Sequence, residues 1–302
     1  MLGMIESFQP LFDQHGWDVT AAKVIQTLSV DELIELVPQH DGWIIGDDPA
    51  TRAVFEAGKA GWLRAAVKWG IGVDNVDFAA CEELGIPITN TPDMFGAEVA
   101  DVAMGYVIAL ARETFEIDRG VRAGQWPKPR GISLAGKTVA LVGFGDIGRN
   151  AARRMLAAGM RVVAYDPFAV DVPELRAVER AQWPQRLGEA DFIVVTCALT
   201  ASSRHLVNAE ALALAKPGVR VVNVGRGPVI DERALEATLE SGQVYSVALD
   251  VFEVEPLPPE AFLRRHPRCV FGSHNASNTA DAVARTSEIA VSMLSVVLVC
   301  QG

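Results

Sequence analysis

Residues 137–168 read KTVALVGFGDIGRNAARRMLAAGMRVVAYDPF, and this stretch decides the fold of the chain. An apolar strand at 138–142 leads directly into a G-x-G-x-x-G motif at 143–148. A helical segment rich in alanine and arginine follows, and a second apolar strand then ends at Asp166. Strand, glycine turn, helix and acidic strand end, in this order and spacing, are typical of a dinucleotide-binding βαβ unit.

Each feature of that unit has a physical task. Gly143 permits the tight turn, Gly145 lets the backbone approach a pyrophosphate, and Gly148 lets the helix pack closely on the strand. The N-terminus of the helix offers unpaired N–H groups and a positive dipole end to the anion. Asp166 can accept hydrogen bonds from both adenosine ribose hydroxyls and would repel a 2′-phosphate. No arginine stands in the two residues after Asp166, so the sequence favours NAD over NADP.

Downstream of this unit, four apolar strands each end at a polar residue. They lie within the segments DFIVVTCALT, VRVVNVGRG, VYSVALDVFEVEP and CVFGSHNAS. In open α/β sheets, ligands bind at the carboxyl ends of the strands, where residues far apart in sequence can meet. The pattern therefore predicts one shared site at this edge, formed by Arg226, Asp250, Glu255 and His274.

The first third of the chain alternates strands with helices in the same way. Strands are predicted at 41–46, 63–68 and 86–90, and helical stretches run between them. A long helix is predicted over 97–124, and a domain boundary is expected near its start. This alternation indicates parallel sheets covered by helices, hence an α/β protein.

Composition narrows the classes of function. The chain has 302 residues, of which 50% are hydrophobic and 22% charged, which suits a soluble protein with two domains. A formal net charge of −11 argues against a nucleic-acid partner, because phosphate backbones are bound by clustered lysine and arginine. The four cysteines lie far apart without a C-x-x-C pair, so no metal site is predicted and a reducing cytoplasm is expected.

The two ends of the chain carry no expected export or membrane signal. The N-terminus lacks a basic segment followed by an apolar one, so no signal peptide is expected. The apolar stretch at 289–300 is short for a bilayer span and is interpreted as a packed terminal helix.

Over nearly its whole length the sequence resembles the D-isomer-specific 2-hydroxyacid dehydrogenases, which include phosphoglycerate dehydrogenases and glyoxylate or hydroxypyruvate reductases. The resemblance rests on KWGIGVDNVD, NTPDMFGAEVAD, GFGDIG, NVGRGPVIDE, ALDVFEVEP and the segment around His274. It implies a Rossmann NAD-binding domain at 94–274, inserted into a smaller flavodoxin-like substrate domain made of 1–93 and 275–302.

The resemblance also implies the catalytic residues Arg226, Glu255 and His274. Oxidising a secondary alcohol removes a hydroxyl proton, so a base that titrates near neutrality must lie within hydrogen-bond reach, and His274 suits this role. A neighbouring carboxylate favours the imidazolium and orients the ring, which the resemblance assigns to Glu255. Glu253 is the alternative carboxylate by spacing alone. Arg226 can bind a carboxylate or polarise a carbonyl.

Further contacts follow from the resemblance alone. The residues implied to contact the cofactor are Gly143, Gly145, Gly148, Asp146, Ile147, Asp166, Val224 and Asp250. Among these, Asp250 is implied to hold the nicotinamide. Backbone amides of Ile71 and Gly72 are implied to receive the substrate carboxylate. Lys68 stands where phosphoglycerate dehydrogenases tend to carry an arginine near the substrate phosphate, so it is either a phosphate ligand or a solvated lysine.

Family members are usually dimers, and the segment RAGQWPKPR at 122–130 resembles the arm that reaches the partner. The expected function is therefore hydride transfer between NAD and a D-2-hydroxy acid or 2-oxo acid of the 3-phosphoglycerate, hydroxypyruvate or glyoxylate class. The alternative is an NAD(H)-sensing regulatory protein of the same fold, since related corepressors can keep the same three residues. The substrate itself and the physiological direction are left open.

Three departures from the family pattern accompany the resemblance. Ser273 precedes the histidine where proline is usual, and Asn275 follows it where an apolar residue is usual. Ala198 replaces a common proline on the adenine side. The first sixteen residues predict a helix with Met4 and Phe8 on its apolar face, whereas family members begin with a strand. Either translation starts upstream, or the domain closes its sheet without that strand.

Overall fold

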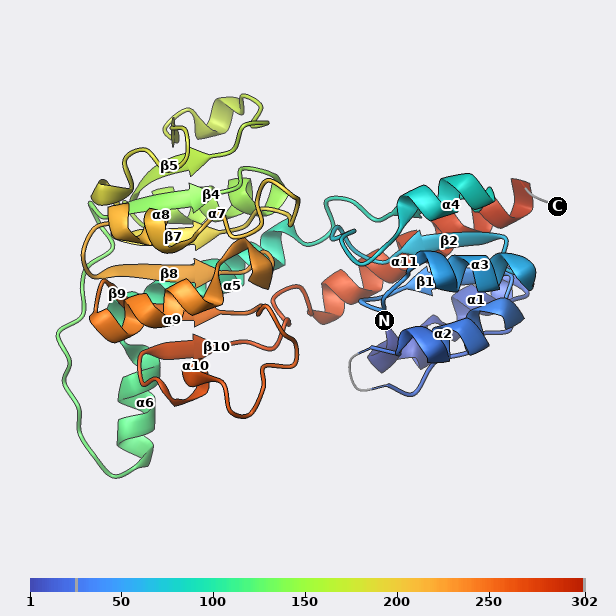
Figure 1. Cartoon of the computed structure of the whole chain (residues 1–302), viewed down its shortest axis with the longest axis horizontal. Coiled ribbons are helices and arrows are strands. Elements are labelled where there is room, and N and C mark those ends of the chain that lie inside the picture. Colours follow the sequence, from blue (N-terminus) through green and yellow to red (C-terminus); the bar gives the residue numbers. More distant parts are fainter. Residues whose placement is uncertain (25–26, 301–302) are drawn as a thin grey trace. The chain divides into compact units, whose positions relative to one another are not determined.

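The computed structural model describes residues 1–24 and 27–300. The chain divides into two compact units, unit 1 comprising Met1–Phe95 with Asn278–Gly302, and unit 2 comprising Gly96–Ser277 (Figure 1). These bounds lie within three residues of the expected boundaries at 93/94 and 274/275. Unit 2 is therefore one continuous stretch of chain, and unit 1 is assembled from both ends.

Unit 2 is built on a parallel sheet, which in the described part of the chain has seven strands in the order β10-β9-β8-β7-β4-β5-β6. This is a doubly wound order: from β4, successive strands are added first on one side, as β5 and β6, and then on the other, from β7 to β10. All its pairings are parallel, so the carboxyl ends of the strands meet at one edge. The strands are β4 Thr138–Val142, β5 Arg161–Tyr165, β6 Glu179–Arg180, β7 Phe192–Val195, β8 Val219–Asn223, β9 Val244–Leu249 and β10 Cys269–Phe271.

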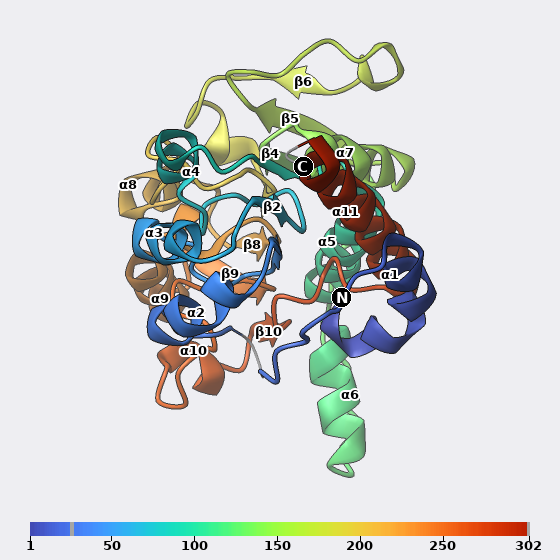
Figure 2. The ribbon, with the colours of Figure 1, turned by 90° about the vertical axis from the view of Figure 1, so that its right-hand side faces the viewer.

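Helices cover both faces of this sheet, as Figure 2 shows, with α8 and α9 on one side and α5 and α7 on the other. Strands β4, β7 and β8 are buried along their whole length because both faces are covered, which explains why they are mostly apolar; Arg220 within β8 is a buried exception. The helices are α5 Gly96–Arg112, α6 Thr114–Arg122, α7 Asp146–Ala157, α8 Ala209–Leu214, α9 Glu232–Ser241 and α10 Phe262–Arg265, with short 3-10 turns at Pro173–Leu175, Leu187–Glu189 and Gly227–Val229.

The single helix predicted over 97–124 is wrong. Glu113 has a left-handed backbone with φ of 54°, which ends α5 and starts α6 in a new direction. The carboxylate of Glu113 accepts a hydrogen bond from the Tyr245 hydroxyl at 2.8 Å, so a tertiary contact accompanies the break. Apolar periodicity runs through the break and could not reveal it.

Unit 1 contains a parallel sheet of three strands among its described residues, in the order β1-β2-β3. Side chains alternate across β2: Ala66 packs toward α3 and α4, whereas Ala65 and Val67 pack against α11. The elements are β1 Gly42–Ile45, β2 Ala65–Lys68, β3 Ile88–Asn90, α2 Val30–Leu36, α3 Arg52–Ala60, α4 Phe78–Leu84 and α11 Ala280–Cys300, with a 3-10 turn at Val37–Gln39.

The N-terminal segment is helical, as predicted, rather than a first strand. It begins as a 3-10 helix at Leu2–Phe8 and continues as α1 at Gln9–His15. Phe8 and Phe12 are buried in one cluster with Val283 and Val291 of α11. The N-terminal segment thus covers α11 and adds no strand to the sheet.

The terminal helix α11 is longer than its apolar stretch suggested. It has 21 residues, so the argument from short length is wrong: by length and hydropathy alone α11 could cross a membrane. In the structure Ala290 and Leu294 are buried against β2, while Val296 and Val299 are exposed. One face of α11 thus completes the core of unit 1, as in a core helix.

Candidate active site

His274 and Glu255 form a close pair at the carboxyl edge of the seven-stranded sheet. Nδ1 of His274 lies 2.7 Å from Oε2 of Glu255, and both side chains are about three-quarters buried. The other Glu255 oxygen accepts the backbone N–H of Phe252 at 2.8 Å, which fixes the carboxylate. A carboxylate in this position selects the tautomer and orientation of the ring and stabilises its protonated form.

The backbone of His274 is also held in place. Its φ of 54° lies in the left-handed region, which few residues other than glycine adopt. Its N–H donates to the carbonyl of Asp250 at 2.7 Å, linking the loop after β10 to the end of β9. Strained backbone of this kind persists only where the surroundings impose it, and it clusters at functional sites.

The alternative carboxylate, Glu253, has a different partner. Its Oε1 lies 2.6 Å from Nε2 of His205, on the segment after β7. The backbone N–H of Glu253 donates to Glu232, whose pKa is raised chiefly by burial and then by the nearby charge of Glu253. The structure therefore pairs Glu255, and not Glu253, with His274.

Arg226 lies on the loop after β8, and buried Asn223 holds that loop. The Asn223 side chain accepts the N–H of Gly225 and donates to the carbonyl of Arg226, both at 3.0 Å. Gly227 packs so closely on the backbone of Phe252 that any Cβ would overlap it. The arginine loop and the Glu255 loop are thereby fixed against each other, which explains the glycine after the arginine.

Asp250 has structural partners in the histidine loop. It is buried, and its two oxygens accept the backbone N–H groups of Asn275 at 3.2 Å and Ala276 at 2.9 Å. Tyr106 of α5 lies near the same carboxylate, and the pKa of its hydroxyl is raised by burial and then by the Asp250 charge. Asp250 thus anchors the segment that carries His274, while its contact with a nicotinamide stays a prediction.

The glycine loop between β4 and α7 fits a dinucleotide. Gly143 has a φ of 97° and packs against Cys197 after β7, and a Cβ on Gly148 would overlap the Gly143 carbonyl. At Gly145, by contrast, a Cβ would meet no atom within 4 Å, so the backbone there is open to a ligand. The N-terminus of the 12-residue helix α7 follows directly, which supplies N–H groups to a pyrophosphate.

The acidic residue after β5 lies beside that loop. Asp166 accepts the N–H of Phe144 at 2.7 Å and of Phe168 at 2.8 Å. Asp166 thus braces the glycine loop, while its contact with an adenosine ribose stays a prediction. Of the other implied contacts, Asp146 begins α7 and adjoins Gly96, Ile147 is half-buried in the first turn, and Val224 is buried after β8.

Besides Arg226, the residues assigned to the substrate are Lys68, Ile71 and Gly72, which lie in unit 1 at the carboxyl edge of its sheet. Ile71 is 41% exposed and Gly72 half-buried, in a loop that Thr91 anchors through the N–H of Gly70 at 2.8 Å. Lys68 is 2% exposed, and its Nζ donates to the carbonyl of Gly46 at 2.6 Å. The interpretation of Lys68 as a solvated surface lysine is therefore wrong.

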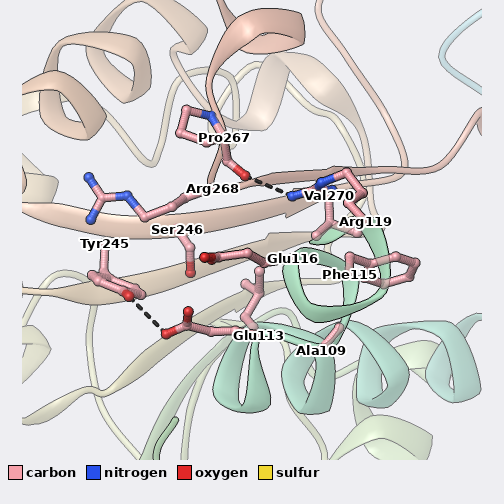
Figure 3. Close-up of a pocket in the computed structure, with 11 residues that line it drawn as sticks. Ala109, Glu113, Phe115, Glu116, Arg119, Tyr245, Ser246, Pro267, Arg268 and Val270 are labelled. Carbon is pink, nitrogen blue, oxygen red and sulfur yellow. Dashed lines mark hydrogen bonds between the residues drawn. The ribbon is translucent and has the colours of Figure 1, made fainter. Parts of the chain in front are cut away.

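Unit 2 also contains a pocket that is separate from the candidate catalytic residues. Figure 3 shows it between α5, α6, β9 and β10, where Tyr245 bonds Glu113 and Arg119 donates to the Pro267 carbonyl at 3.0 Å. Neither Arg226, Glu255 nor His274 lines it. Within the described residues, no group of three or more histidine, cysteine or acidic side chains is arranged to hold a metal ion.

Three residues with positioning contacts escaped the sequence analysis, namely Asn223, Tyr106 and His205. A polar residue at the end of an apolar strand was a usable signal for Asn223. Tyr106 lies in an apolar helical run and His205 in a polar loop, so nothing local distinguishes them. Only the fold brings them to Asp250 and Glu253.

Comparison with known proteins identifies the family of this arrangement. The family model for D-isomer specific 2-hydroxyacid dehydrogenase, NAD binding domain, matches residues 104–276. A hydroxypyruvate reductase of Thermotoga maritima is 38% identical over 289 residues, which cover 93% of this chain and 90% of that protein. A D-3-phosphoglycerate dehydrogenase of Methanocaldococcus jannaschii is 34% identical, but the chain spans only 54% of its length.

A solved structure shows the same architecture along the chain. A protein from Thermus thermophilus superimposes with a TM-score of 0.89 at 31% sequence identity, covering 97% of this chain and 93% of that one. The matched family model includes the glycine loop, Asp166, Arg226, Glu255 and His274.

Proposed function

We propose, from the premise that this chain belongs to the D-isomer specific 2-hydroxyacid dehydrogenases, that Arg226, Glu255 and His274 carry out its reaction. The chain is an NAD-dependent oxidoreductase for a 2-hydroxy acid and 2-oxo acid pair. Its proposed substrates are of the hydroxypyruvate, glyoxylate or 3-phosphoglycerate class. The observation that carries the proposal is the 2.7 Å pair of His274 and Glu255 at the carboxyl edge of the NAD-binding sheet.

The proposed chemistry divides between cofactor and protein. NADH, when bound, supplies the hydride that reduces the carbon of the 2-oxo group. Protonated His274 donates a proton to the oxygen of that group as negative charge develops there, and takes it back in the oxidative direction. Glu255 stabilises the imidazolium before the transfer and holds the ring orientation throughout.

The substrate is held by groups that recognise a carboxylate. Arg226 carries a planar fork of donors suited to a carboxylate or a polarised carbonyl oxygen. The backbone amides of Ile71 and Gly72 are the proposed second carboxylate contact, on a loop that Thr91 anchors.

A panel of 2-oxo acids tests this function. Purified protein is mixed with NADH and glyoxylate, pyruvate, hydroxypyruvate or its 3-phosphate ester, and the NADH absorbance is followed. We expect turnover with at least one acid and formation of the D-hydroxy product. Tight NADH binding without turnover of any acid would favour the alternative, an NAD(H)-sensing protein.

We also propose a homodimer formed through unit 2. Five exposed apolar side chains lie on α5, α6, the segment after α6 and β10, namely Ile108, Phe115, Val121, Trp126 and Phe271. Exposed apolar surface is common at interfaces, and a second copy of the chain is the proposed partner. Light scattering should give a mass near twice 32.4 kDa, and a monomer at micromolar concentration would rule the dimer out.

A reducing, cytoplasmic location is proposed as well. Cys81, Cys197 and Cys269 are free thiols in the structure, and burial raises the pKa of Cys197 to about 11. Helix α11 is proposed to remain a core helix of unit 1, since its buried face completes that core. Cell fractionation with detection of NADH-dependent activity in the soluble fraction tests both proposals.

A further inference from the structure

Lys68 stands at the end of β2, where a cation could meet a second anionic group of the substrate. Its ammonium donates to the carbonyls of Gly46 at 2.6 Å and Trp69 at 3.3 Å. It also forms an ion pair with Asp47 at 3.5 Å. Of the three N–H donors of a lysine ammonium, two can thus serve the backbone carbonyls, and the Asp47 carboxylate lies within ion-pair distance. The ammonium thus lies among protein acceptors, and the Asp47 carboxylate offsets its charge.

The loops around this ammonium are acidic. Because β1, β2 and β3 are parallel, the loops that follow them meet at one edge of the sheet. These loops, at 46–51, 69–77 and 91–95, contain no lysine or arginine. They carry five aspartates, Asp47, Asp48, Asp74, Asp77 and Asp93. The electrostatic field at this edge is therefore set mainly by carboxylates.

A second cation, Arg285 of α11, reaches the same loops and is also engaged. Its guanidinium donates to the carbonyl of Met94 at 2.6 Å, in the loop after β3. Arg285 and Lys68 thus both donate hydrogen bonds to backbone carbonyls at this edge. Arg52, at the start of α3, also interacts with the charge of Asp77, but it pairs with Glu83 at 2.8 Å. The five aspartates therefore exceed these three positive charges.

Two of these aspartates have structural tasks that keep them in place. Asp48 accepts the N–H of Leu28 at 2.9 Å, and Asp77 caps α4 through the N–H of Ala80 at 2.8 Å. Asn75 ties the edge together by donating to the carbonyls of Gly46 and Asp48. The Gly46 carbonyl thus accepts hydrogen bonds from both Asn75 and Lys68. Lys68 therefore links the end of β2 to the end of β1.

We propose that this edge makes the enzyme selective for 2-oxo acids whose only anionic group is the carboxylate, and that it disfavours their phosphate esters. The inference rests on the proposed function, in which the loop at Ile71 and Gly72 receives the substrate carboxylate. Backbone amides bind a single carboxylate without a cationic side chain. A phosphate adds a charge of about −1.5 to −2 and would face the aspartates with Lys68 already engaged.

The first test compares two substrates that differ only in the phosphate. The ratio kcat/KM is measured with NADH for hydroxypyruvate and for its 3-phosphate ester at low ionic strength. We expect hydroxypyruvate to be preferred by a factor on the order of 10 to 100, because like charges repel strongly near a low-dielectric surface. Added salt should narrow the gap. Equal or better use of the phosphate ester would overturn the inference while leaving the proposed function intact.

A second test uses variants at the same edge. Asp47→Asn removes the negative partner of Lys68 at a half-exposed position, so the relative kcat/KM for the phosphate ester should rise about threefold to tenfold. The matched control is Asp31→Asn, which removes an exposed charge in the first turn of α2 and should leave the ratio unchanged. Lys68→Met should not lower kcat/KM for the phosphate ester more than it lowers kcat/KM for hydroxypyruvate. A selective fall in kcat/KM for the phosphate ester in Lys68→Met would contradict the inference. An unchanged ratio of the two kcat/KM values in Asp47→Asn would contradict it as well.

If neither hydroxypyruvate nor any other oxo acid is reduced, the proposed function fails, and the selectivity fails with it. Thermal unfolding of each variant is measured alongside the kinetics. For a Lys68→Met protein that does not fold, the comparison of the two substrates on the unaltered enzyme and on Asp47→Asn still decides the question.

Discussion

Nδ1 of His274 lies 2.7 Å from Oε2 of Glu255, although the two residues belong to loops that follow different strands, β9 and β10. Because β9 and β10 are adjacent and parallel, their carboxyl ends deliver both side chains to the same point. Glu253, only two residues from Glu255, points to His205 instead. This division of two nearby glutamates between two histidines provides a matched pair for mutagenesis.

His274→Ala should abolish most turnover without preventing cofactor binding. The expected fall in kcat is a factor on the order of 100 to 10,000, the usual contribution of a positioned acid or base. NADH affinity should be nearly unchanged, because the glycine loop and Asp166 belong to other strand ends. Steady-state kinetics and NADH fluorescence titration measure the two quantities. Near-normal turnover in the variant would exclude His274 as the proton-transfer group.

Glu255→Gln should shift the pH dependence of 2-oxo acid reduction. The amide keeps a hydrogen bond to the ring but removes the charge that favours the imidazolium, so activity should decline at lower pH than in the unaltered enzyme. A pH profile of kcat/KM tests this. Glu253→Gln is the control, since its carboxylate contacts His205, and its profile should not move. Identical profiles for all three proteins would refute the role of Glu255.

Arg226→Lys should mainly impair substrate capture. A point charge replaces a planar fork of donors, so the KM for the oxo acid should rise by a factor on the order of 10. The substitution alters the donation from the Arg226 side chain to the Gly225 carbonyl, but the loop should keep its shape because Asn223 also holds its backbone. Kinetics with varied oxo acid and varied NADH separate the two KM values. An effect confined to the KM for NADH would contradict this assignment.

Asp166→Ala should weaken the preference for NADH over NADPH. The substitution removes the acceptor for the ribose hydroxyls and relieves repulsion of a 2′-phosphate. It also frees the N–H of Phe144, so the KM for NADH should rise as well. Asp171→Ala, at a fully exposed carboxylate five residues away, is the control. Comparable use of NADPH and NADH by the unaltered protein would show that Asp166 does not select the cofactor.

Glu232→Gln should stabilise the protein at neutral pH. Burial and the charge of Glu253 raise the pKa of Glu232, so the folded state binds its proton more tightly than the unfolded state does. That contribution to stability is present at acidic pH and is lost as the pH rises through the raised folded pKa. Glutamine mimics the protonated form, so the melting temperature should rise by about 1–3 °C at pH 7–8.

The rise in melting temperature of Glu232→Gln should become smaller toward pH 4, where Glu232 of the unaltered protein is itself protonated. Melting curves over this pH range provide the measurement, with exposed Glu210→Gln as the control. A constant difference between Glu232→Gln and the unaltered protein at every pH would mean that the charge of Glu232 costs no stability.

The sequence alone determined the elements whose signal is local. The glycine turn at 143–148, its flanking strands and Asp166 are recognisable because backbone approach and helix packing demand those residues at that spacing. The N-terminal helix was also predictable from the spacing of apolar residues such as Phe8 and Phe12. The break at Glu113 was not, because apolar periodicity continues through it and a tertiary bond to Tyr245 accompanies it.

Side-chain partners were decided by the tertiary structure. Spacing left both Glu253 and Glu255 open as partners of His274, and the loop geometry after β9 chose between them. Lys68 ends a strand where a lysine is usually solvated, yet its ammonium contacts the Gly46 carbonyl and the Asp47 carboxylate after β1 and the Trp69 carbonyl after β2. A residue type determines which bonds a side chain can form. Only the fold determines which of the possible partners lie within reach of it.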